Sequence, residues 1–529
     1  MSLRLVYRLA VVGFVSVWAS SQAAADVTLP PFFSDHMVLQ RETSAPIWGT
    51  ALPGEKVTVR FRDQAPTATA DEAGKWRVEL KGLKAGGPDE LVIAGKNEIK
   101  LTDVLVGEVW VGSGQSNMQG NVGGYAKNDP VLTELAATAH PQVRGCGAGR
   151  PWEVSTPENN PRFSAILFAF AVRLQEELDV PVGMMLGAVG GTPSGAWLSE
   201  QALADDTACQ KLMAQYRDVD YPKELKDYET RIVPAWEKQL EAAKAAGKEG
   251  KDLPAKPRPP FTPDTANFQK PGYLYQAHIR PLVGYGIRGV LWDQGESRTA
   301  VGGVDQYTMM GALVRGWRKE WNQGDFPFLY VQKPSGGGCA WDPADPVTAQ
   351  GAKFTPQPGQ QPGKLDENVG VRAGALFVEN HVQIMNYPGV AMVTSIDLGA
   401  GVHPTNKSGY GARAARVASA VAYGKQVEYY GPIYASHTVE GNKVRIKFTH
   451  VGKGLAARHS DKLQGFAIAG DDKNFFWGDA VIDGDTVVVS SPNVEKPASV
   501  RYAWGQNRPW ANLFNQDGLP APMFRTDAW

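Results

Sequence analysis

The sequence VWVGSGQSNMQG runs from Val109 to Gly120 and joins an apolar run to small and polar residues. Its branched and aromatic start is typical of a buried β-strand. Glycines end that strand pattern, and Ser116 then stands between two amide residues, Gln115 and Asn117. Three structures fit these letters: a phosphate-binding loop, a plain turn, and a nucleophile at the carboxyl end of a strand.

Two motifs with known mechanics do not match this stretch. The run that begins at Gly112 lacks the third glycine of G-x-G-x-x-G, and no G-K-[ST] follows it, so a phosphate-binding loop is not indicated. The surroundings of Ser116 also differ from the G-x-S-x-G turn of α/β-hydrolases. A plain turn and a nucleophile remain open on these letters alone.

Residues 106–424 alternate between strand patterns and helix patterns. Alternation of this kind predicts an α/β domain of three layers, α/β/α, with a mainly parallel central sheet. Ligands of such sheets bind beyond the carboxyl ends of the strands. The expected strands beyond the opening stretch are 180–191, 287–297 and 388–399, and the expected helices are 163–178, 307–321 and 406–424.

The pattern of apolar and turn residues divides the rest of the chain into further regions. With 529 residues the chain is too long for a single core. Short alternating strands separated by turn residues predict an N-terminal β domain over 26–105 and a C-terminal β domain over 425–529, both sandwich-like. Within the α/β domain we expect a helical insertion at about 201–262 and a long Gly-, Pro- and Gln-rich loop at about 336–363.

Composition limits the function classes. The 54 basic and 55 acidic residues balance, so nothing favours nucleic acid or an anionic membrane as partner. Residues 1–25 combine early arginines, a short apolar run and an A-x-A site, which predicts a signal peptide, a secreted or periplasmic location, and no membrane insertion after cleavage. No H-E-x-x-H or C-x-x-C spacing occurs, so we expect neither a metal nor a cofactor.

A serine nucleophile needs a base, a group that orients the base, and donors for the oxyanion. His403 follows an expected strand and precedes an expected helix, with Pro404 at its first turn. Gly191 lies at the end of another strand and can supply a backbone N–H. Gln294 ends a third strand and can supply an amide N–H. Three strand ends therefore offer a nucleophile, a base and donors.

Four motifs in this order, GQSNM, GGT, WDQGES and VHPTNK, resemble the SGNH-hydrolase superfamily, and within it the sialate O-acetylesterase group and related carbohydrate acetylesterases. The N-terminal LPPFFSDHMVLQR and the C-terminal NLFNQDGLPAPMFRTD also resemble that group, so the similarity covers nearly the whole mature chain. It implies that Ser116 is the nucleophile and His403 the base. It further implies that Gly191 and Gln294 join the Ser116 N–H in the oxyanion hole.

The third member of the triad departs from the superfamily pattern. An aspartate usually stands two or three residues before the histidine, where this chain has Gly401 and Ala400. Either the acid has moved or a backbone carbonyl holds the imidazole. We expect Asp293 first, Glu296 second and Asp397 third as the displaced acid.

The resemblance implies a secreted serine esterase that removes O-acetyl groups from carbohydrate through an acetyl-enzyme. The helical insertion and the long loop are less usual for the group and favour a plant cell-wall polysaccharide such as xyloglucan as the acetylated substrate. The alternatives are a sialate 9-O-acetylesterase, a non-catalytic carbohydrate-binding protein, and a hydrolase of another ester class such as a lipase.

Overall fold

A computed structural model describes residues 26–147, 149–217, 221–257, 259, 271–333, 361, 365, 373–399, 401–505, 508 and 510–529. The expected signal peptide and nearly all of the expected long loop lie outside these residues.

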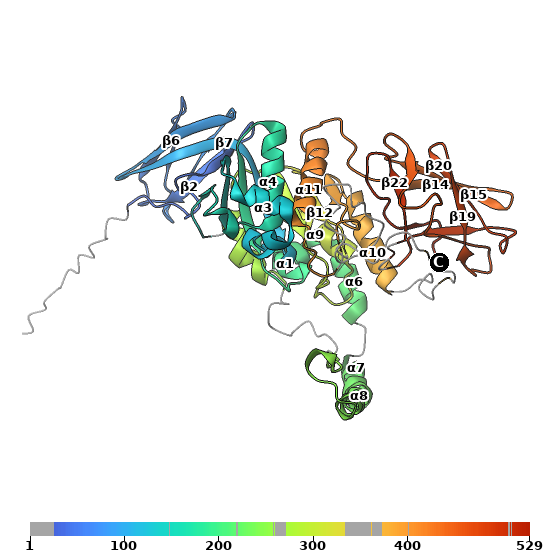
Figure 1. Cartoon of the computed structure of the whole chain (residues 1–529). Helices are drawn as coiled ribbons and strands as arrows, with labels where there is room; N and C mark the ends of the chain where they lie inside the picture. The colour runs from blue at the N-terminus through green and yellow to red at the C-terminus, as the bar shows by residue number, and fades with distance from the viewer. Residues whose placement is uncertain are drawn as a thin grey trace, which may run out of the picture.

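A mainly parallel sheet forms the centre of the molecule (Figure 1). Its strands follow the order β13-β12-β11-β7-β10-β8-β9, and each neighbouring pair is parallel except β8 with β9. Their bounds are β7 (Glu98–Gly114), β8 (His140–Gly147), β9 (Glu153–Ser155), β10 (Val182–Ala188), β11 (Gly289–Asp293), β12 (Phe328–Val331) and β13 (Val390–Val393).

Strand β7 belongs to two sheet regions at once. Its first half pairs with β6 (Gly86–Ala94) and β1 (Val38–Gln40), and its second half pairs with β10 and β11. Every residue from Val104 to Gly114 is buried, as expected of a central strand covered on both faces. The boundary expected between residues 105 and 106 therefore lies inside one continuous strand.

Helices cover both faces of the central sheet. Helices α4 (Ala165–Leu178) and α11 (Lys407–Val421) lie on one face, where the Phe170 ring of α4 meets Trp110 of β7 at 5.2 Å between centroids. Helix α9 (Gln306–Trp321) lies on the other face, where Trp317 meets Trp292 of β11 at 5.9 Å. The layers are therefore α/β/α (Figure 1).

Further strands build β-sheet regions at both ends of the chain (Figure 1). Towards the N-terminus these are β2 (Ala45–Thr50), β3 (Lys56–Phe61), β4 (Thr67–Thr69) and β5 (Lys75–Leu80). Towards the C-terminus they are β14 (Ile433–Glu440), β15 (Lys443–Thr449), β16 (Leu455–Ala457), β17 (Phe466–Ala469), β18 (Phe476–Trp477), β19 (Asp479–Asp483), β20 (Thr486–Ser490), β21 (Ser499–Tyr502), β22 (Leu513–Asn515) and β23 (Phe524–Arg525).

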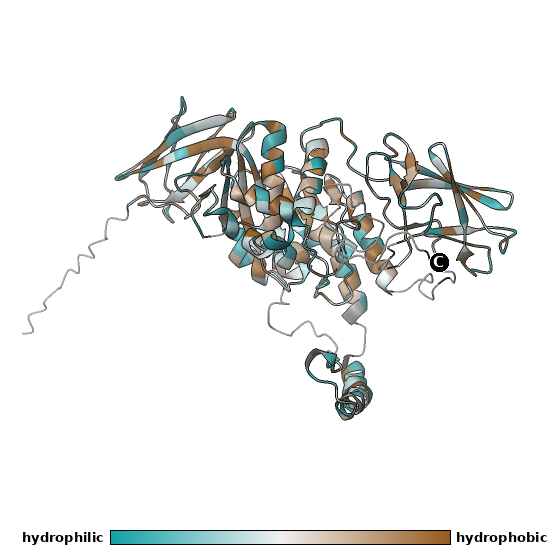
Figure 2. Cartoon of the chain, in the orientation of Figure 1, coloured by the Kyte–Doolittle hydropathy of each residue, from teal (hydrophilic) through white to brown (hydrophobic). Residues whose placement is uncertain are grey.

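The segment between β10 and β11 contains several helices among its described residues. It contains α5 (Glu200–Asp205), α6 (Thr207–Arg217), α7 (Tyr221–Asp227) and α8 (Val233–Ala245). The pair α7 and α8 projects away from the sheet, and Figure 2 shows that many of its residues are hydrophilic. The remaining α-helices are α1 (Ser116–Gln119), α2 (Val122–Tyr125), α3 (Pro130–Ala137) and α10 (Ala373–Gln383).

The predicted fold class is confirmed: the protein is a mixed α/β protein with a mainly parallel central sheet and additional β-sheet regions. Within the described part of the chain, no helix has both the length and the apolar character needed to cross a bilayer.

Candidate active site

Ser116 is the first residue of the short helix α1, directly beyond the carboxyl end of β7. The turn depends on Gly114, whose φ is +122° and where an added Cβ would lie 2.1 Å from the Asp293 carbonyl oxygen. The Gln115 N–H donates to that same carbonyl at 2.8 Å. Only glycine allows this close approach of β7 to β11, so the packing of the two strands sets the position of Ser116.

His403 lies beside Ser116 in space, although 287 residues separate them in the chain. The His403 Nε2 atom is 2.8 Å from the Ser116 Oγ, within hydrogen-bond reach for a base that accepts the serine proton. The His403 side chain is exposed to solvent. Helix α11 begins at Lys407 with Asn406 as its N-cap, within one residue of the expected start, so Pro404 lies before the helix and not in its first turn.

The loop that follows β10 passes directly over Ser116. A Cβ placed on Gly190 would lie 3.3 Å from the Ser116 Cβ, and the Gly190 N–H donates to the Gln119 side-chain oxygen at 2.8 Å. Gly191 follows with a φ of +72°. Within the described residues, the backbone N–H groups of Ser116 and Gly191 donate no hydrogen bond. Both groups are therefore available to an oxyanion.

Gln294 is buried beyond the end of β11, but its amide has other partners than an oxyanion. Its Nε2 donates to the carbonyls of Thr192 at 3.2 Å and Arg298 at 3.0 Å. Its Oε1 accepts from Gln306 of α9 at 3.1 Å. Both amide hydrogens of Gln294 are therefore used in hydrogen bonds to neighbouring loops. The bond to Thr192 holds the loop that carries Gly191.

The first two candidates for the missing acid pair with a lysine that the sequence reading missed. Lys333 lies two residues beyond β12, and its Nζ is 2.6 Å from Asp293 Oδ1 and 2.9 Å from Glu296 Oε1. Lys333 and Asp293 are completely buried. The sequence contains a signal for Lys333, because this residue follows the carboxyl end of a buried strand, as Ser116 and Gln294 do.

The third candidate is also engaged elsewhere. Asp397 forms a buried ion pair with Arg413 of α11, with contacts of 3.0 and 3.2 Å. Ala400 lies outside the described residues, and Gly401 has a φ of +87°. In the part of the chain that the structure describes, no carboxylate contacts the His403 ring.

A different residue connects Ser116 to the histidine loop. Asn117, the residue after Ser116, is buried, and its Nδ2 donates to the backbone carbonyl of Val402 at 3.0 Å. Its Oδ1 accepts from the Nζ of Lys407 at 2.5 Å. The Lys407 Nζ also lies 4.5 Å from the centroid of the Tyr125 ring. Asn117 and Lys407 both belong to the motifs quoted above, but neither was assigned a role.

Burial and the neighbouring charges together set the pKa values of this cluster. Burial lowers the pKa of Lys407 to about 7, although Asp293 and Glu296 oppose the shift. Burial alone would lower the pKa of Lys333, but the carboxylates of Asp293 and Glu296 raise it overall. Burial raises the pKa of Asp293 against the effect of Lys333. Of the two lysines, Lys333 therefore keeps its charge at neutral pH, and Lys407 titrates there.

A pocket of about 500 Å³ lies beside the end of β10, and Ser116 is not one of its lining residues. Its lining includes Gln119 of α1 together with Ala188 and Val189, which precede the glycines of the loop after β10. A volume of this size is within the range of small-ligand sites. Among the residues that the structure describes, no cluster of His, Cys, Asp and Glu has the grouping needed to hold a metal ion.

No protein-family model matches the chain. Two curated proteins named sialate O-acetylesterase, from Homo sapiens and Pongo abelii, are each 27% identical to it over 60% of its length. The chain is homologous to the sialate O-acetylesterases. It spans 59% of the length of these relatives. The resemblance predicted from the four motifs is thereby confirmed.

A solved structure extends this similarity to almost the whole chain. A carbohydrate acetylesterase from Xanthomonas citri is 29% identical, with a TM-score of 0.72, and the match covers 95% of this chain and 100% of that one. The similarity thus includes both flanking β-sheet regions as well as the central sheet.

Proposed function

We propose that the chain is a secreted serine esterase that removes O-acetyl groups from carbohydrate. The observation that carries the proposal is the 2.8 Å contact between Ser116 Oγ and His403 Nε2 at the carboxyl edge of the parallel sheet. The similarity to carbohydrate acetylesterases supports acetyl esters of sugars as the substrate class. The finer substrate that we propose is an acetylated plant cell-wall polysaccharide such as xyloglucan.

In the proposed reaction, Ser116 Oγ attacks the acetyl carbonyl carbon while His403 Nε2 accepts the serine proton. The N–H groups of Ser116 and Gly191 donate to the oxyanion of the tetrahedral intermediate. The bond to the sugar oxygen then breaks, and His403 returns its proton to that oxygen. Water attacks the acetyl-enzyme with His403 again as base, which releases acetate and restores Ser116. The reaction requires no cofactor.

We propose that the backbone of its own loop, and not a carboxylate, orients the His403 imidazole. The hydrogen bond from Asn117 to the Val402 carbonyl supports this assignment, because it fixes the residue directly before His403 to the residue directly after Ser116. Lys407 in turn fixes the Asn117 amide. The nucleophile and the base are then held as a dyad, and Asn117 is a positioning residue.

The names of the curated relatives favour a second candidate, hydrolysis of O-acetyl sialic acid. The two candidates share the acetyl group and differ in the sugar. The deciding experiment measures acetate release by the full-length protein from acetylated xyloglucan, acetylated xylan and 9-O-acetyl sialic acid. We expect the highest kcat/KM with xyloglucan and no release by Ser116→Ala.

Two results would contradict parts of the proposal. If kcat/KM is highest with 9-O-acetyl sialic acid, the esterase assignment stands, but the proposed polysaccharide substrate is replaced by sialic acid. Absence of acetate release from all three substrates, with the folded protein still retained by the polysaccharides, would favour a non-catalytic carbohydrate-binding protein.

A further inference from the structure

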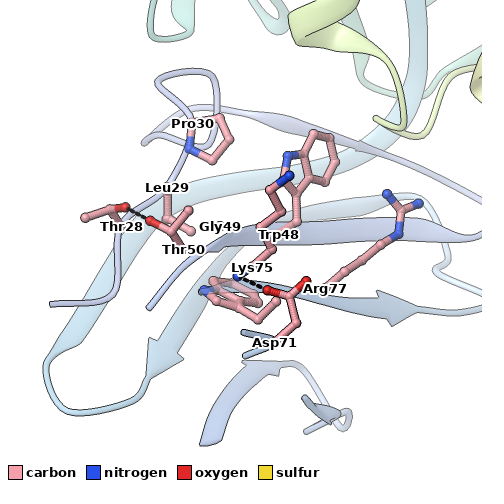
Figure 3. A pocket seen from close by; sticks show the side chains of 10 residues that line it. Thr28, Leu29, Pro30, Trp48, Gly49, Thr50, Asp71, Lys75 and Arg77 are labelled. Carbon is pink, nitrogen blue, oxygen red and sulfur yellow. Dashed lines mark hydrogen bonds between the residues drawn. The ribbon is translucent and has the colours of Figure 1, made fainter. Parts of the chain in front are cut away.

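A second cavity lies in the N-terminal β-sheet region, away from the carboxyl edge of the central sheet (Figure 3). Strands β2 and β5 pair in antiparallel register, which places Trp48 opposite Arg77 and Thr50 opposite Lys75. The cavity has a volume of about 640 Å³, which is ample for more than one sugar ring. Its lining consists of Thr28, Leu29, Pro30, Trp48, Gly49, Thr50, Asp71, Lys75, Trp76 and Arg77.

Trp48 offers a partly exposed aromatic ring to this cavity. The ring meets that of Phe33 edge-to-face, with centroids 4.8 Å apart, and the Arg77 guanidinium lies 5.5 Å from its centroid. Phe33 is buried, and its contact with the indole, together with the Arg77 guanidinium over the ring, holds Trp48 in one orientation. A ring that is already fixed loses little conformational entropy when a ligand packs against it.

Polar groups surround the ring. Lys75 and Arg77 are exposed on the same strand, and within the described residues the Lys75 side chain has no ion-pair partner. The Asp71 carboxylate accepts the backbone N–H groups of Ala73 and Lys75, at 2.9 and 2.8 Å, and so fixes the turn before β5. Figure 3 shows Trp48, Lys75 and Arg77 on neighbouring positions of the two strands.

We propose that this cavity binds a segment of a glycan chain, with one sugar ring packed against Trp48 and its oxygens accepting hydrogen bonds from Lys75 and Arg77. A pyranose has an apolar C–H face and a rim of oxygens, which matches a fixed aromatic ring bordered by cationic donors. Ser116 lies beyond the carboxyl end of β7, and the residues that line the cavity include none of the candidate catalytic groups. It would retain a polymeric substrate and have no part in the chemistry.

The test measures binding of the full chain to polysaccharide by affinity gel electrophoresis. Xyloglucan serves as a neutral probe and polygalacturonate as an acidic one, because both present sugar rings rimmed with oxygen acceptors. Trp48→Ala and Lys75→Ala remove the ring and one donor. Lys56→Ala is the matched control, an exposed lysine on β3 outside the cavity.

We expect the wild type and Lys56→Ala to be retarded by at least one polysaccharide, and Trp48→Ala to bind at least about tenfold more weakly, the loss typical of a truncated aromatic anchor. Lys75→Ala should weaken binding in the same gels. Acetate release from a small acetylated monosaccharide should be unchanged in these variants, so loss of polymer binding is separated from loss of the esterase.

If Trp48→Ala does not fold by circular dichroism, Lys75→Ala decides the question by itself. Equal retardation of the wild type and folded Lys75→Ala and Trp48→Ala would overturn the proposal. Failure of the wild type to bind either polysaccharide would also overturn it, whether or not the protein is an esterase.

Discussion

The Asn117 side chain donates a 3.0 Å hydrogen bond to the Val402 carbonyl, and thereby connects the residue after the candidate nucleophile to the residue before the candidate base. Because Asn117 is buried and its oxygen is bound by Lys407, the amide has little freedom to reorient. We propose that this contact takes the place of the carboxylate that the superfamily pattern puts before the histidine.

Removing the donor of that contact should slow the chemical step. In Asn117→Asp a carboxylate faces the Val402 carbonyl and repels it, so the His403 loop shifts. We expect kcat to fall roughly ten- to a hundredfold, as small displacements of catalytic groups do, with KM nearly unchanged. Asn97→Asp is the control, because the Asn97 side chain also donates to a backbone carbonyl, that of Val27, in the N-terminal β-sheet region. Wild-type kcat in Asn117→Asp would refute the positioning role.

Ser116→Ala should abolish acetate release and leave the fold intact. The hydroxyl contacts the exposed His403 ring, so its loss removes little packing, whereas loss of a nucleophile costs several orders of magnitude in rate. Acetate release and the thermal midpoint are measured on the same sample. A variant that keeps a tenth of the activity would exclude Ser116 as nucleophile.

Asp293→Asn should act mainly on stability. The substitution removes one of the two acidic partners that Lys333 has among the described residues and leaves Glu296. Breaking a buried pair costs about 3–5 kcal/mol. We expect folded Asp293→Asn to keep kcat close to wild type. A fall of about 10⁴ would instead identify Asp293 as the group that sets the imidazole tautomer.

Glu296→Gln and Asp397→Asn are compared in the same assay. Asp397 is paired with Arg413 and Glu296 with Lys333, so we expect neither variant to show the large kcat loss of a triad acid. Such a loss in either one would replace the dyad with a triad that contains that residue.

Gln294→Ala separates a loop-holding role from an oxyanion role. Its amide binds the carbonyls of Thr192 and Arg298, and unpaired buried carbonyls cost about 1–3 kcal/mol each. We therefore expect both a lower thermal midpoint and a lower kcat. A kcat loss of roughly 10²–10³ with an unchanged midpoint would show that the amide donates to the oxyanion after all.

Lys407 should make stability depend on pH. Its pKa in the folded protein is about 7, well below the value of about 10.4 for an unfolded lysine. Between these values the unfolded chain binds more protons, so the stability contributed by this site rises with pH. The thermal midpoint of the wild type relative to Lys407→Met should therefore increase from about pH 7 towards 10. A constant difference between the two proteins would contradict the shift, and Lys56→Met serves as the exposed control.

The sequence alone determined the layered α/β fold and the pairing of Ser116 with His403. Both follow from local patterns, since the apolar runs that end in glycine define parallel strands, and the carboxyl ends of parallel strands meet at one edge. Ser116, Gly191 and His403 each follow such an end, and the structure brings them together there. No long-range side-chain contact had to be known for this.

Only the tertiary structure decided the partners of the buried charges. Asp293, Glu296 and Asp397 are equivalent as letters near strand ends, but a buried carboxylate is stable only beside a cation or donors. Which cation reaches each carboxylate depends on the chain beyond β12, which carries Lys333, and on α11, which carries Arg413. These contacts support the proposal that the backbone orients the imidazole, because each candidate acid already lies beside a cation: Asp293 and Glu296 share Lys333, and Asp397 pairs with Arg413.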